Sequence, residues 1–540
     1  MRYRASEIKI GPEEFKDREH LPEHLMAALQ RKLRRKLRRQ IHISDLEIIR
    51  ESVDARHRPD VKGVYTLDFD SDSRLDLPRG GRESYLPPVP DLAEVSGHPR
   101  PVIAGFGPCG IFAALILAEA GLRPLVLERG RAVDQRMADV QRFWSEGILD
   151  PESNVQFGEG GAGTFSDGKL TTGIRDIRIR NVLETFVEAG ADPKILYQQR
   201  PHIGTDKLQT IIPAIRKRIE KAGGEIRFGA RMEGITTSGG KLTAVTYSQA
   251  PDGEQVMAAD SEKFASPDRE QLTVPTEDLI LAIGHSARDT FAMLHQSQPA
   301  IKMEQKPFSI GVRIEHPQEV IDAAQYGDPA LAEVFGPAAY QLHYRCTDGR
   351  GVYTFCMCPG GQVINASSEA EGAVTNGMSN SGRDSGVANS GLLVDVRVTD
   401  FDSDHPLAGI DFQRRYEKLA LQQGRIFPGG LPSTNYQAFR ENQEDPVRKC
   451  LPAFASGSIL EAMPHLGRKL AGFDAEDARM TAVETRSSSP VRILRDEQMQ
   501  SGIPGVIPAG EGPGYAGGIM SAAVDGIRAA EQVIRKYMGE

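Results

Sequence analysis

Residues 101–130 read PVIAGFGPCGIFAALILAEAGLRPLVLERG, a pattern that predicts a strand, a tight glycine turn, a helix and a second strand. Residues 102–104 form a short apolar run typical of a buried parallel strand. Gly105, Gly107 and Gly110 give the spacing G-x-G-x-x-G. The first glycine permits the turn, the second lets the backbone approach a pyrophosphate, and the third lets the helix pack close to the strand. Since strand, turn, helix and strand fall in register, we expect a dinucleotide-binding unit rather than an ordinary glycine turn.

The helix expected at about 109–120 points its N-terminal amides, and the positive end of its dipole, at the bound anion. The second strand, 125–127, ends at Glu128, about 20 residues past the glycines. A carboxylate at this position is expected to accept hydrogen bonds from a ribose diol. Arg131 and Arg136 follow, and either arginine reaches a phosphate or is a solvated surface charge.

Composition and charge describe a globular protein without a membrane or nucleic-acid signature. The chain has 540 residues, 39% hydrophobic and 26% charged, with a net charge of −9. Its length suits about two or three domains. The start, MRYRASEIKIG, lacks the apolar core of a signal peptide, and glycines and Pro108 interrupt the apolar run at 102–118, so we expect a cytoplasmic protein without a membrane span. The five cysteines give no disulfide framework, and without a second cysteine pair Cys356 and Cys358 predict no metal site.

Residues 1–90 are expected to form a small N-terminal α+β module. Strands are predicted at 3–10, 45–55 and 63–69, and a helix with leucines at i, i+4 spacing at 21–39. This β-α-β-β order suggests a ferredoxin-like half. A linker rich in proline and glycine, 80–100, separates the module from the glycine turn.

The helix at 21–39 is strongly basic. It is either a site for RNA, acidic protein or an anionic surface, or a solvated face that pairs with the acidic remainder of the chain. We favour the solvated face, because no aromatic residues interleave with the charges as single-strand binding would require. Nucleic acid is therefore not an expected partner. The charged residues are Arg31, Lys32, Arg34, Arg35, Lys36, Arg38 and Arg39.

A glycine-rich stretch, NVQFGEGGAGTFSDGKLTTG, occupies residues 154–173. Ordering so long a loop costs chain entropy, so a bound cofactor wrapped by the amides of 160–164 is the natural cause. A flexible linker is the alternative, and the embedded Phe165, Asp167 and Lys169 argue against it.

A helix is expected at 207–222. It is followed by a strand, EIRFGARMEGI (225–235), with period-two alternation. We then expect a small antiparallel segment that includes KLTAVTY, and a strand, DLILAIG, that returns to the parallel sheet. His285 and Arg288 follow that return strand, at the edge where open α/β sheets bind ligands. Residues 301–484, with strands at 308–315, 351–358 and 362–366, are expected to form an inserted mixed domain that covers the cofactor and shapes a substrate cavity.

The final segment, 505–534, reads as strand, glycine loop and helix, with Glu511 ending the strand and Gly517 and Gly518 preceding the helix. A second helix start facing a phosphate implies a long dinucleotide gripped at both ends.

These pieces together resemble the FAD-binding signature of two-dinucleotide-fold flavoproteins with a glutathione-reductase-like FAD domain. Gly105–Glu128 matches the ADP-binding unit, TEDLILAIGHSA (276–287) the middle strand–glycine motif, and VIPAGEG (506–512) the C-terminal motif. Glu511 stands where that motif usually has Asp. More narrowly, the chain resembles a bacterial family of FAD-dependent dehydrogenases of unassigned substrate. The segments that carry this narrower resemblance are SVDAR (52–56), GEGGAGTFSDGKL (158–170), PHIGTDKL (201–208), TFCMCPGG (354–361), ETRSSSPVRI (484–493) and PAGEGPGYAGGIMSAAVDG (508–526).

The resemblance implies FAD as cofactor and an α/β fold. The expected plan is a Rossmann-like FAD-binding domain in two parts, 99–300 and 485–540, an inserted mixed α+β substrate or cap domain at 301–484, and the N-terminal ferredoxin-like module at 1–90. The expected FAD contacts are Gly105, Gly107, Pro108, Cys109, Gly110, Glu128, Arg129, Arg136, Gly161, Ala162, Gly163, Thr164, Phe165, Ser166, Met232, Ala282, Gly284, Gly510, Glu511, Gly517, Gly518 and Ile519.

The expected function is an FAD-dependent oxidoreductase, or dehydrogenase, that transfers a hydride at the flavin to or from an unidentified small molecule. Only one G-x-G-x-x-G unit is evident. Either NADH or NADPH donates the electrons without a dinucleotide-binding domain of its own, or another compound is the reductant. The alternative is a flavoprotein with a non-redox, RNA-binding or protein-binding role through the basic N-terminal helix.

The catalytic candidates are Lys169, Arg486, Cys356 and Cys358. Lys169, Arg486, Arg313 and Arg492 are candidate holders of an anionic substrate, with structural ion pairing as the alternative. Cys356 and Cys358 are either a redox pair, one reactive thiol, or two small core residues on one face of a strand, and we favour the core interpretation. Ser487–Ser489 and His285 are further candidates for hydrogen bonding and proton transfer, against structural roles.

Overall fold

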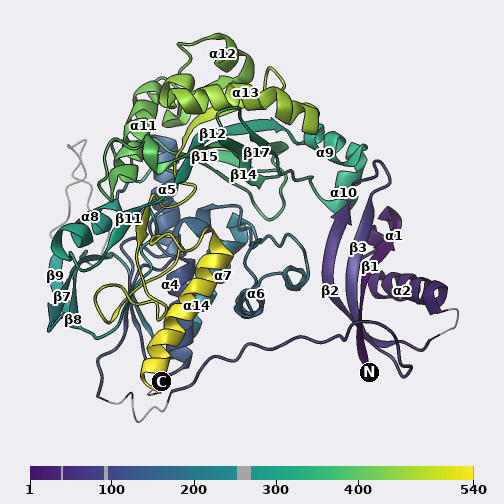
Figure 1. Ribbon diagram of the computed structural model, residues 1–540, viewed down its shortest axis with the longest axis horizontal. Coiled ribbons are helices and arrows are strands. Elements are labelled where there is room, and N and C mark those ends of the chain that lie inside the picture. The colour runs from purple at the N-terminus through teal and green to yellow at the C-terminus, as the bar shows by residue number, and fades with distance from the viewer. Residues whose placement is uncertain (38–40, 91–94, 96, 252–268, 539–540) are drawn as a thin grey trace.

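The computed structural model describes residues 1–37, 41–90, 95, 97–251 and 269–538. Its elements group into three parts: an N-terminal module (elements within residues 2–70), a part built on a parallel sheet, here called the parallel-sheet domain, and an antiparallel part, here called the cap domain (elements within residues 308–484), above that sheet's edge (Figure 1). Arg38 and Arg39 of the predicted basic helix lie outside the described residues. No helix in the described ranges is both long and apolar enough to cross a membrane.

The N-terminal module is an antiparallel sheet of order β1-β3-β2 with α2 packed on β1. Its apolar face buries the leucines of α2 against Tyr65, Leu67 and Phe69. Lys32 of α2 donates to the carbonyl oxygens of Ser6 and Glu7, so part of the helix's charge is used inside the module. The elements are β1 (Arg2–Ile10), α1 (Pro12–Lys16), α2 (Leu21–Leu37), β2 (Ser44–Asp54) and β3 (Lys62–Asp70).

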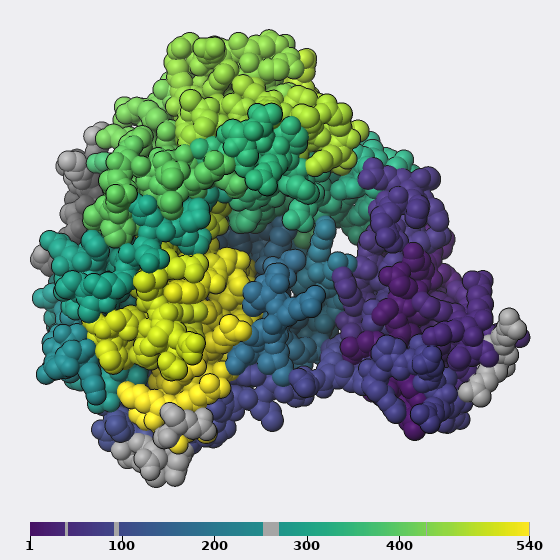
Figure 2. Space-filling model, viewed as in Figure 1, coloured from purple at the N-terminus to yellow at the C-terminus, as the bar shows by residue number. Residues whose placement is uncertain are grey.

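The module contacts both other parts of the molecule. Glu51 of β2 donates its amide to the carbonyl oxygen of Tyr197 at 2.8 Å and accepts from the amide of Gln199 at 2.9 Å. Phe15 packs against Phe335 of the cap domain with ring centroids 4.7 Å apart. Figure 2 shows the module, in purple, meeting the cap domain at its upper end.

The second part is a five-stranded parallel sheet of order β21-β10-β4-β5-β6. Alternation of side chains divides the strands between two cores. Ile103 and Val126 face one core, whereas Val102 and Leu125 face the other. The strands are β4 (Val102–Ala104), β5 (Leu125–Leu127), β6 (Glu225–Arg227), β10 (Leu279–Leu281) and β21 (Val506–Pro508).

Helices cover one face of this sheet, and a second, antiparallel sheet covers the other. α4 and α14 pack side by side over β4, with α7 beside α4, as Figure 1 shows. α4 is apolar all round and is buried along almost its whole length, which explains the hydrophobic run of the sequence. The helices on this face are α4 (Pro108–Glu119), α6 (Arg178–Glu188), α7 (Thr205–Lys221) and α14 (Ile519–Lys536). α8 (Arg288–Ser297) packs in the core on the other face, and α5 (Val133–Glu146) packs in a small cluster with the glycine-rich loop and β15 (Gln362–Asn365) and β16 (Thr375–Met378) of the cap domain. The antiparallel sheet is β7 (Ala230–Ser238), β8 (Lys241–Gln249) and β9 (Glu270–Pro275).

The prediction of one continuous strand at 225–235 is wrong. Residues 225–227 join the parallel sheet as β6, and residues 230–238 leave it as β7 of the antiparallel sheet. Gly229, with φ of +66°, makes the break, and alternation continues across it, so the pattern alone does not reveal two strands.

The cap domain is a six-stranded antiparallel sheet of order β13-β14-β17-β12-β19-β18, with helices on the face away from the cavity. β12 and β17 pair over ten residues at its centre. The strands of this sheet are β12 (Phe308–Pro317), β13 (His343–Arg345), β14 (Gly351–Cys358), β17 (Val387–Val396), β18 (Ser433–Asn435) and β19 (Arg479–Glu484). β15 (Gln362–Asn365) and β16 (Thr375–Met378) pair as a separate two-stranded sheet. β11 (Met303–Gln305) and β20 (Val491–Ile493) form another, which packs into the second core of the parallel-sheet domain. The helices are α9 (Gln318–Tyr326), α10 (Ala332–Phe335), α11 (Ala408–Gly424), α12 (Tyr436–Glu441) and α13 (Ala453–Lys469).

Candidate functional site

A cavity of about 390 Å³ opens at the carboxyl ends of the parallel strands and extends to the cap domain. β4 lies between β5 and β10, so the chain leaves this point of the sheet in two directions. Ligands of open α/β sheets bind at such a switch point. Ala104, Leu127 and Ala282, at the ends of these three strands, all line the cavity.

Two of the three glycines in the turn are required by the protein's own packing, and the third is not. Gly105 has φ of +101°, and a Cβ there would lie 2.3 Å from the carbonyl oxygen of Ala282. A Cβ at Gly110 would lie 1.9 Å from the carbonyl oxygen of Gly105. Gly107 differs: its φ is −78°, and its Cβ would meet only the Cα of Gly161 at 3.7 Å. The protein alone leaves room for a side chain at Gly107, which faces the cavity.

Two helices begin at the cavity without a side-chain cap. Gly107 precedes α4 and Gly518 precedes α14, and neither helix has an acidic residue in its first turn. Their free amides and positive dipole ends suit an anion. Gly517, beside Gly518, lines the cavity and would place a Cβ with no atom within 4 Å. The residues therefore fit a long ligand with an anionic centre that approaches the backbone closely.

Glu128 ends β5 and faces the cavity, but its carboxylate already binds the loops around it. One oxygen accepts from the amide of Phe106 at 2.7 Å, and the other accepts from the amides of Gly130 and Gly158, both at 2.9 Å. A carboxylate has about four lone-pair sites, so room remains for a ribose hydroxyl. The contact to ribose stays a prediction.

The two arginines among the predicted FAD contacts occupy different positions. Arg129 lines the cavity and pairs with Glu152 at 3.2 Å and Asp289 at 2.9 Å. Arg136 lies completely buried behind the wall, where it donates to the carbonyl oxygens of Asn154, Val155 and Glu159. Arg136 is therefore not placed to contact a phosphate. Its guanidinium stabilises the conformation of the glycine-rich loop instead. Arg131 pairs with Asp139.

Most of the predicted FAD contacts lie on the cavity wall. Those on the wall are Gly105, Gly107, Pro108, Cys109, Glu128, Arg129, Gly161, Ala162, Gly163, Ser166, Met232, Ala282, Gly284, Glu511, Gly517, Gly518 and Ile519. Those buried behind it are Gly110, Arg136, Thr164, Phe165 and Gly510.

Three of the four predicted catalytic residues also line the cavity. Lys169 places its ammonium 2.8 Å from Asp167, and Cys356 and Arg486 come from the cap side. Cys358 lies fully buried behind Cys356. The expectation that both cysteines share one face of a regular strand is wrong, since β14 bulges between Phe355 and Cys358.

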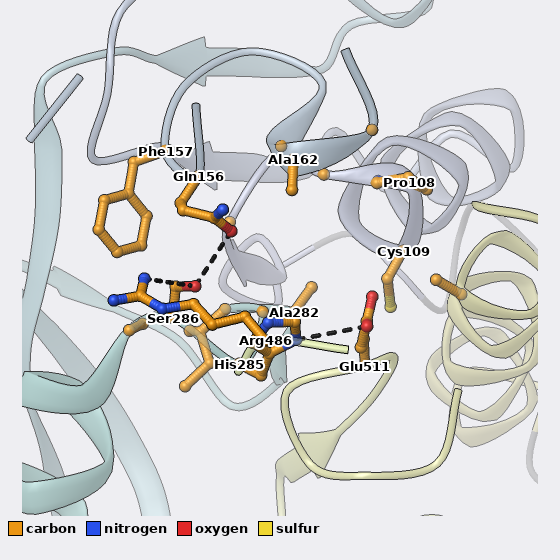
Figure 3. Close-up of a pocket in the computed structure, with 18 of the residues that line it drawn as sticks. Pro108, Cys109, Gln156, Phe157, Ala162, Ala282, His285, Ser286, Arg486 and Glu511 are labelled. Atoms are coloured by element: carbon orange, nitrogen blue, oxygen red, sulfur yellow. Dashed lines mark hydrogen bonds and ion pairs between the residues drawn. The ribbon is translucent and has the colours of Figure 1, made fainter. Parts of the chain in front are cut away.

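Arg486 is held by a network around Glu417. It donates to Glu417 at 3.1 Å and 3.3 Å and to the hydroxyls of Ser286 and Ser368. Arg288 completes the network with its own contacts to Glu417. The two guanidinium groups lower the pKa of Glu417 strongly although burial opposes them. Figure 3 shows Arg486 beside Ser286, whose hydroxyl donates to Gln156.

A second buried ion pair borders the cavity on the cap side. Arg313 lies 2.7 Å from Glu484 and donates to the carbonyl oxygen of Cys356. Burial raises the pKa of Glu484 to about 7, with the Arg313 guanidinium opposing the shift. Arg313 is completely buried, and Arg492 stacks on the ring of Tyr515, so the structure places neither arginine on the cavity wall.

His285 approaches Glu511 across the cavity, with 3.3 Å between Nδ1 and the carboxylate (Figure 3). Its other ring nitrogen, Nε2, is buried without a hydrogen-bond partner. His285 thus lines the cavity with its ring fixed at Nδ1, and Nε2 is a buried polar atom that the protein leaves without a partner.

Sequence reasoning missed part of the wall. Glu484 looks like the last residue of an ordinary strand, and Gln156 and Phe157 precede the glycines without a motif of their own. Only their convergence in space marks them. Wall residues that the sequence did not single out as contacts include Gln156, Phe157, Arg231, Ser286, Thr290, Phe355, Asn376 and Glu484.

Comparison with known proteins gives two domain matches and one full-length relative. Residues 307–487 match the family described as "FAD-dependent protein, C-terminal domain-like", and residues 2–70 match "Domain of unknown function (DUF8436)". An uncharacterized protein of Clostridium beijerinckii is 40% identical over 524 residues, which cover 92% of this chain and 93% of that protein.

Similar solved structures are more distant. A geranylgeranyl bacteriochlorophyll reductase-like protein of Thermoplasma acidophilum is 12% identical, with a TM-score of 0.36, over 82% of each chain. A glycerol-3-phosphate dehydrogenase of Bacillus halodurans, complexed with FAD, is 13% identical, with a TM-score of 0.33, over 83% of this chain and 66% of that one.

The domain match and the shape of the cavity agree on the cofactor. The match over 307–487 is to FAD-dependent proteins, and the open glycine positions at Gly107 and Gly517, each next to a helix start, fit a dinucleotide. The chain is therefore a flavoprotein with FAD as its cofactor.

Proposed function

The chain belongs to the same family as the uncharacterized protein of Clostridium beijerinckii, and we propose that it is an FAD-dependent oxidoreductase acting on a small molecule under the cap domain. When bound, FAD supplies two-electron chemistry, and the protein places a substrate against it. One observation carries this proposal: a single cavity connects the glycine cradle of the parallel-sheet domain with polar side chains of the cap domain.

The position of the cradle orients the cofactor along this cavity. The pyrophosphate belongs at Gly107 and the start of α4, and the ribose at Glu128. The rest of the dinucleotide then extends past Gly161–Gly163 toward the start of α14. The cap-side wall with Phe355, Cys356 and Arg486 lies beyond and is left for the substrate.

Lys169 is the residue that we assign to the substrate. Its ammonium pairs with one oxygen of Asp167 and has further donors for a ligand on the cavity wall. This favours a substrate with a carboxylate or phosphate group. Arg486 differs, because Glu417, Ser286 and Ser368 already take its donors. We assign it a positioning role, in which it fixes Ser286 and the adjoining wall.

His285 supplies a second polar contact from the parallel-sheet side. Glu511 holds Nδ1 at 3.3 Å and so fixes the ring. The ring lines the cavity, so a bound flavin or substrate would lie against it.

Anaerobic reduction of the purified protein tests the proposal. Its visible spectrum reports bound flavin, and NADH, NADPH and a panel of small carboxylates and phosphates are each mixed with it while bleaching is followed. Rapid bleaching by a nicotinamide makes the protein a reductase that uses that donor. Bleaching only by a member of the panel makes the protein a dehydrogenase for that compound.

A matched pair of lysine variants locates the substrate contact. Lys169→Met should keep the flavin spectrum and slow bleaching by the effective reductant at least tenfold. Lys194→Met is the control, because Lys194 pairs with Asp192 on the surface. Purified protein without flavin, or flavin that no tested reductant bleaches although dithionite does, would refute the proposed function.

A further inference from the structure

Cys356 and Cys358 are brought together by a distortion of β14. Phe355 pairs with Gly391 and Cys358 with Asn389, so β14 has one more residue than its partner strand between these positions. Cys356 occupies the extra position and has φ of +43°, a left-handed conformation that is rare for a residue with a side chain. A backbone held in such a conformation is often found at functional sites.

The bulge also makes a bond between the two sulfurs feasible. In a regular strand the Cα atoms of residues i and i+2 lie about 6.6–7 Å apart, at or beyond the upper limit for a disulfide. In the bulge the Cys358 sulfur lies 3.3 Å from the carbonyl oxygen of Cys356, so the two cysteines are direct neighbours. Cys356 is consequently on the cavity wall, and Cys358 lies directly behind it, fully buried.

The two thiols are in different electrostatic states. The Cys358 thiol donates to the carbonyl oxygen of Cys356 at 3.3 Å and can turn to hydrogen-bond the neighbouring sulfur. That hydrogen bond, with the nearby cations of Lys169 and Arg313, holds the pKa of Cys356 well below that of a free thiol, whereas burial and the adjacent thiolate raise that of Cys358.

The charges that face this pair come from several elements. Lys169 and Asp167 reach it from the glycine-rich loop, Arg313 from β12 and Glu484 from β19. Asp167 and Glu484 are bound to the two cations, at 2.8 Å and 2.7 Å. A low-pKa thiolate at a cavity beside a high-pKa thiol is the arrangement of redox-active dithiols.

We propose that Cys356 and Cys358 form a redox-active dithiol that exchanges an electron pair with the flavin in the same cavity. A Cys356 thiolate, a Cys358 thiol and oxidised FAD become a Cys356–Cys358 disulfide and anionic reduced FAD. The Cys358 S–H bond breaks and the S–S bond forms, and the flavin takes both electrons and the proton from Cys358. The reverse step regenerates the dithiol. This inference rests on the flavin site of the proposed function.

The pair is distinguished from the other cysteines of the chain by its environment. Cys109 lines the cavity as well, but it is a single thiol packed against Gly510, and burial raises its pKa. Cys346 and Cys450 are buried elsewhere in the cap domain. Cys346→Ser is therefore the control, because that thiol belongs to no pair and does not line the cavity.

Counting electrons tests the exchange directly. The holoprotein is oxidised with diamide, freed of oxidant and titrated with dithionite under argon. The wild type and Cys346→Ser should take up twice as many electrons per FAD as Cys356→Ser and Cys358→Ser, because a disulfide and a flavin each accept one pair. An equal uptake in all four proteins would overturn the proposal.

Mass spectrometry provides a readout that does not depend on the variants folding. Trypsin releases residues 351–383 as one peptide that contains both cysteines. After oxidation of the wild type, this peptide should be lighter by two hydrogens and should not react with iodoacetamide. If it keeps two free thiols, the dithiol does not exist. A protein that purifies without FAD but forms this disulfide refutes the proposed function and, with it, the exchange with flavin, while showing that the thiols pair.

Discussion

Arg288 and Glu417 form a bidentate ion pair, with distances of 2.8 Å and 2.7 Å, between α8 of the parallel-sheet domain and α11 of the cap domain. Both side chains are 1% exposed. Arg486 and the hydroxyl of Thr485 bind the same carboxylate. The pair thus fixes the cap domain above the cavity at a point next to the substrate side.

Replacing Glu417 should weaken the whole chain. Glu417→Gln leaves the guanidinium groups of Arg288 and Arg486 buried with only Glu369 near both, and breaking a buried pair in this way costs about 3–5 kcal/mol. Denaturant unfolding measures the loss. Glu441→Gln is the control, because that carboxylate pairs with Arg440 on the surface, and its change should stay within about 0.5 kcal/mol. A loss that small for Glu417→Gln would contradict the role assigned to the network.

The Arg288–Glu417 pair also predicts that the difference in stability between the wild type and Glu417→Gln depends on pH in the acid range. The pKa of Glu417 is lowered in the folded state from an ordinary value of 4.5, so its contribution to stability is present above pH 4.5 and lost as the pH falls further. The difference in unfolding free energy between wild type and Glu417→Gln should therefore be constant above about pH 5.5 and shrink below about pH 4.5. A difference that stays constant down to pH 3 would show that Glu417 does not carry the charge.

The two glycines of the turn should separate folding from cofactor binding. Gly107→Ala adds a methyl group to open space in the cavity, so the protein should melt as the wild type does and bind FAD at least tenfold more weakly. Gly105→Ala should not fold normally, because its Cβ would lie 2.3 Å from the carbonyl oxygen of Ala282. The ratio of flavin absorbance to protein, with a melting curve, distinguishes the two. Undiminished flavin in Gly107→Ala would place the pyrophosphate elsewhere.

Lys169 should control the reactivity of Cys356. Without the ammonium the thiolate loses a neighbouring positive charge, so in Lys169→Met the pKa of Cys356 should rise. The flavin-free protein is alkylated with iodoacetamide at a series of pH values, and the rate is read from peptide 351–383 after digestion. Lys194→Met is the control. The profile of Lys169→Met should move to higher pH, and coincident profiles would exclude an electrostatic link.

The glycine turn and its surroundings could be predicted from sequence because the signal is local. Gly105 and Gly110 must be glycine because a Cβ at either position would collide with backbone atoms of the turn or of the residues that follow β10. The spacing of the two glycines in the sequence therefore predicts the turn. Arg136 shows the limit of the same approach: its position suits a phosphate, yet three carbonyl groups of the glycine-rich loop use its donors. The sequence reveals the positive charge of Arg136 but not the carbonyl groups that bind its guanidinium in place of a phosphate.

Features that depend on distant segments were beyond sequence reasoning. The network of Arg288, Glu417 and Arg486 joins residues far apart in the chain, none of which belongs to a motif with the others. The bulge at Cys356 was missed for a different reason: alternation predicts a regular strand, and only the register against β17 shows the additional residue.

The order of the chain determines when the cavity can be completed during synthesis. Gly105 and Gly107 emerge early, but Glu511, Gly518 and the start of α14 follow the entire cap domain. Until β21 emerges from the ribosome, β10 remains an unpaired edge of the parallel sheet. A chain cut short before β21 would therefore contain the glycine turn but lack Glu511, Gly518 and the start of α14.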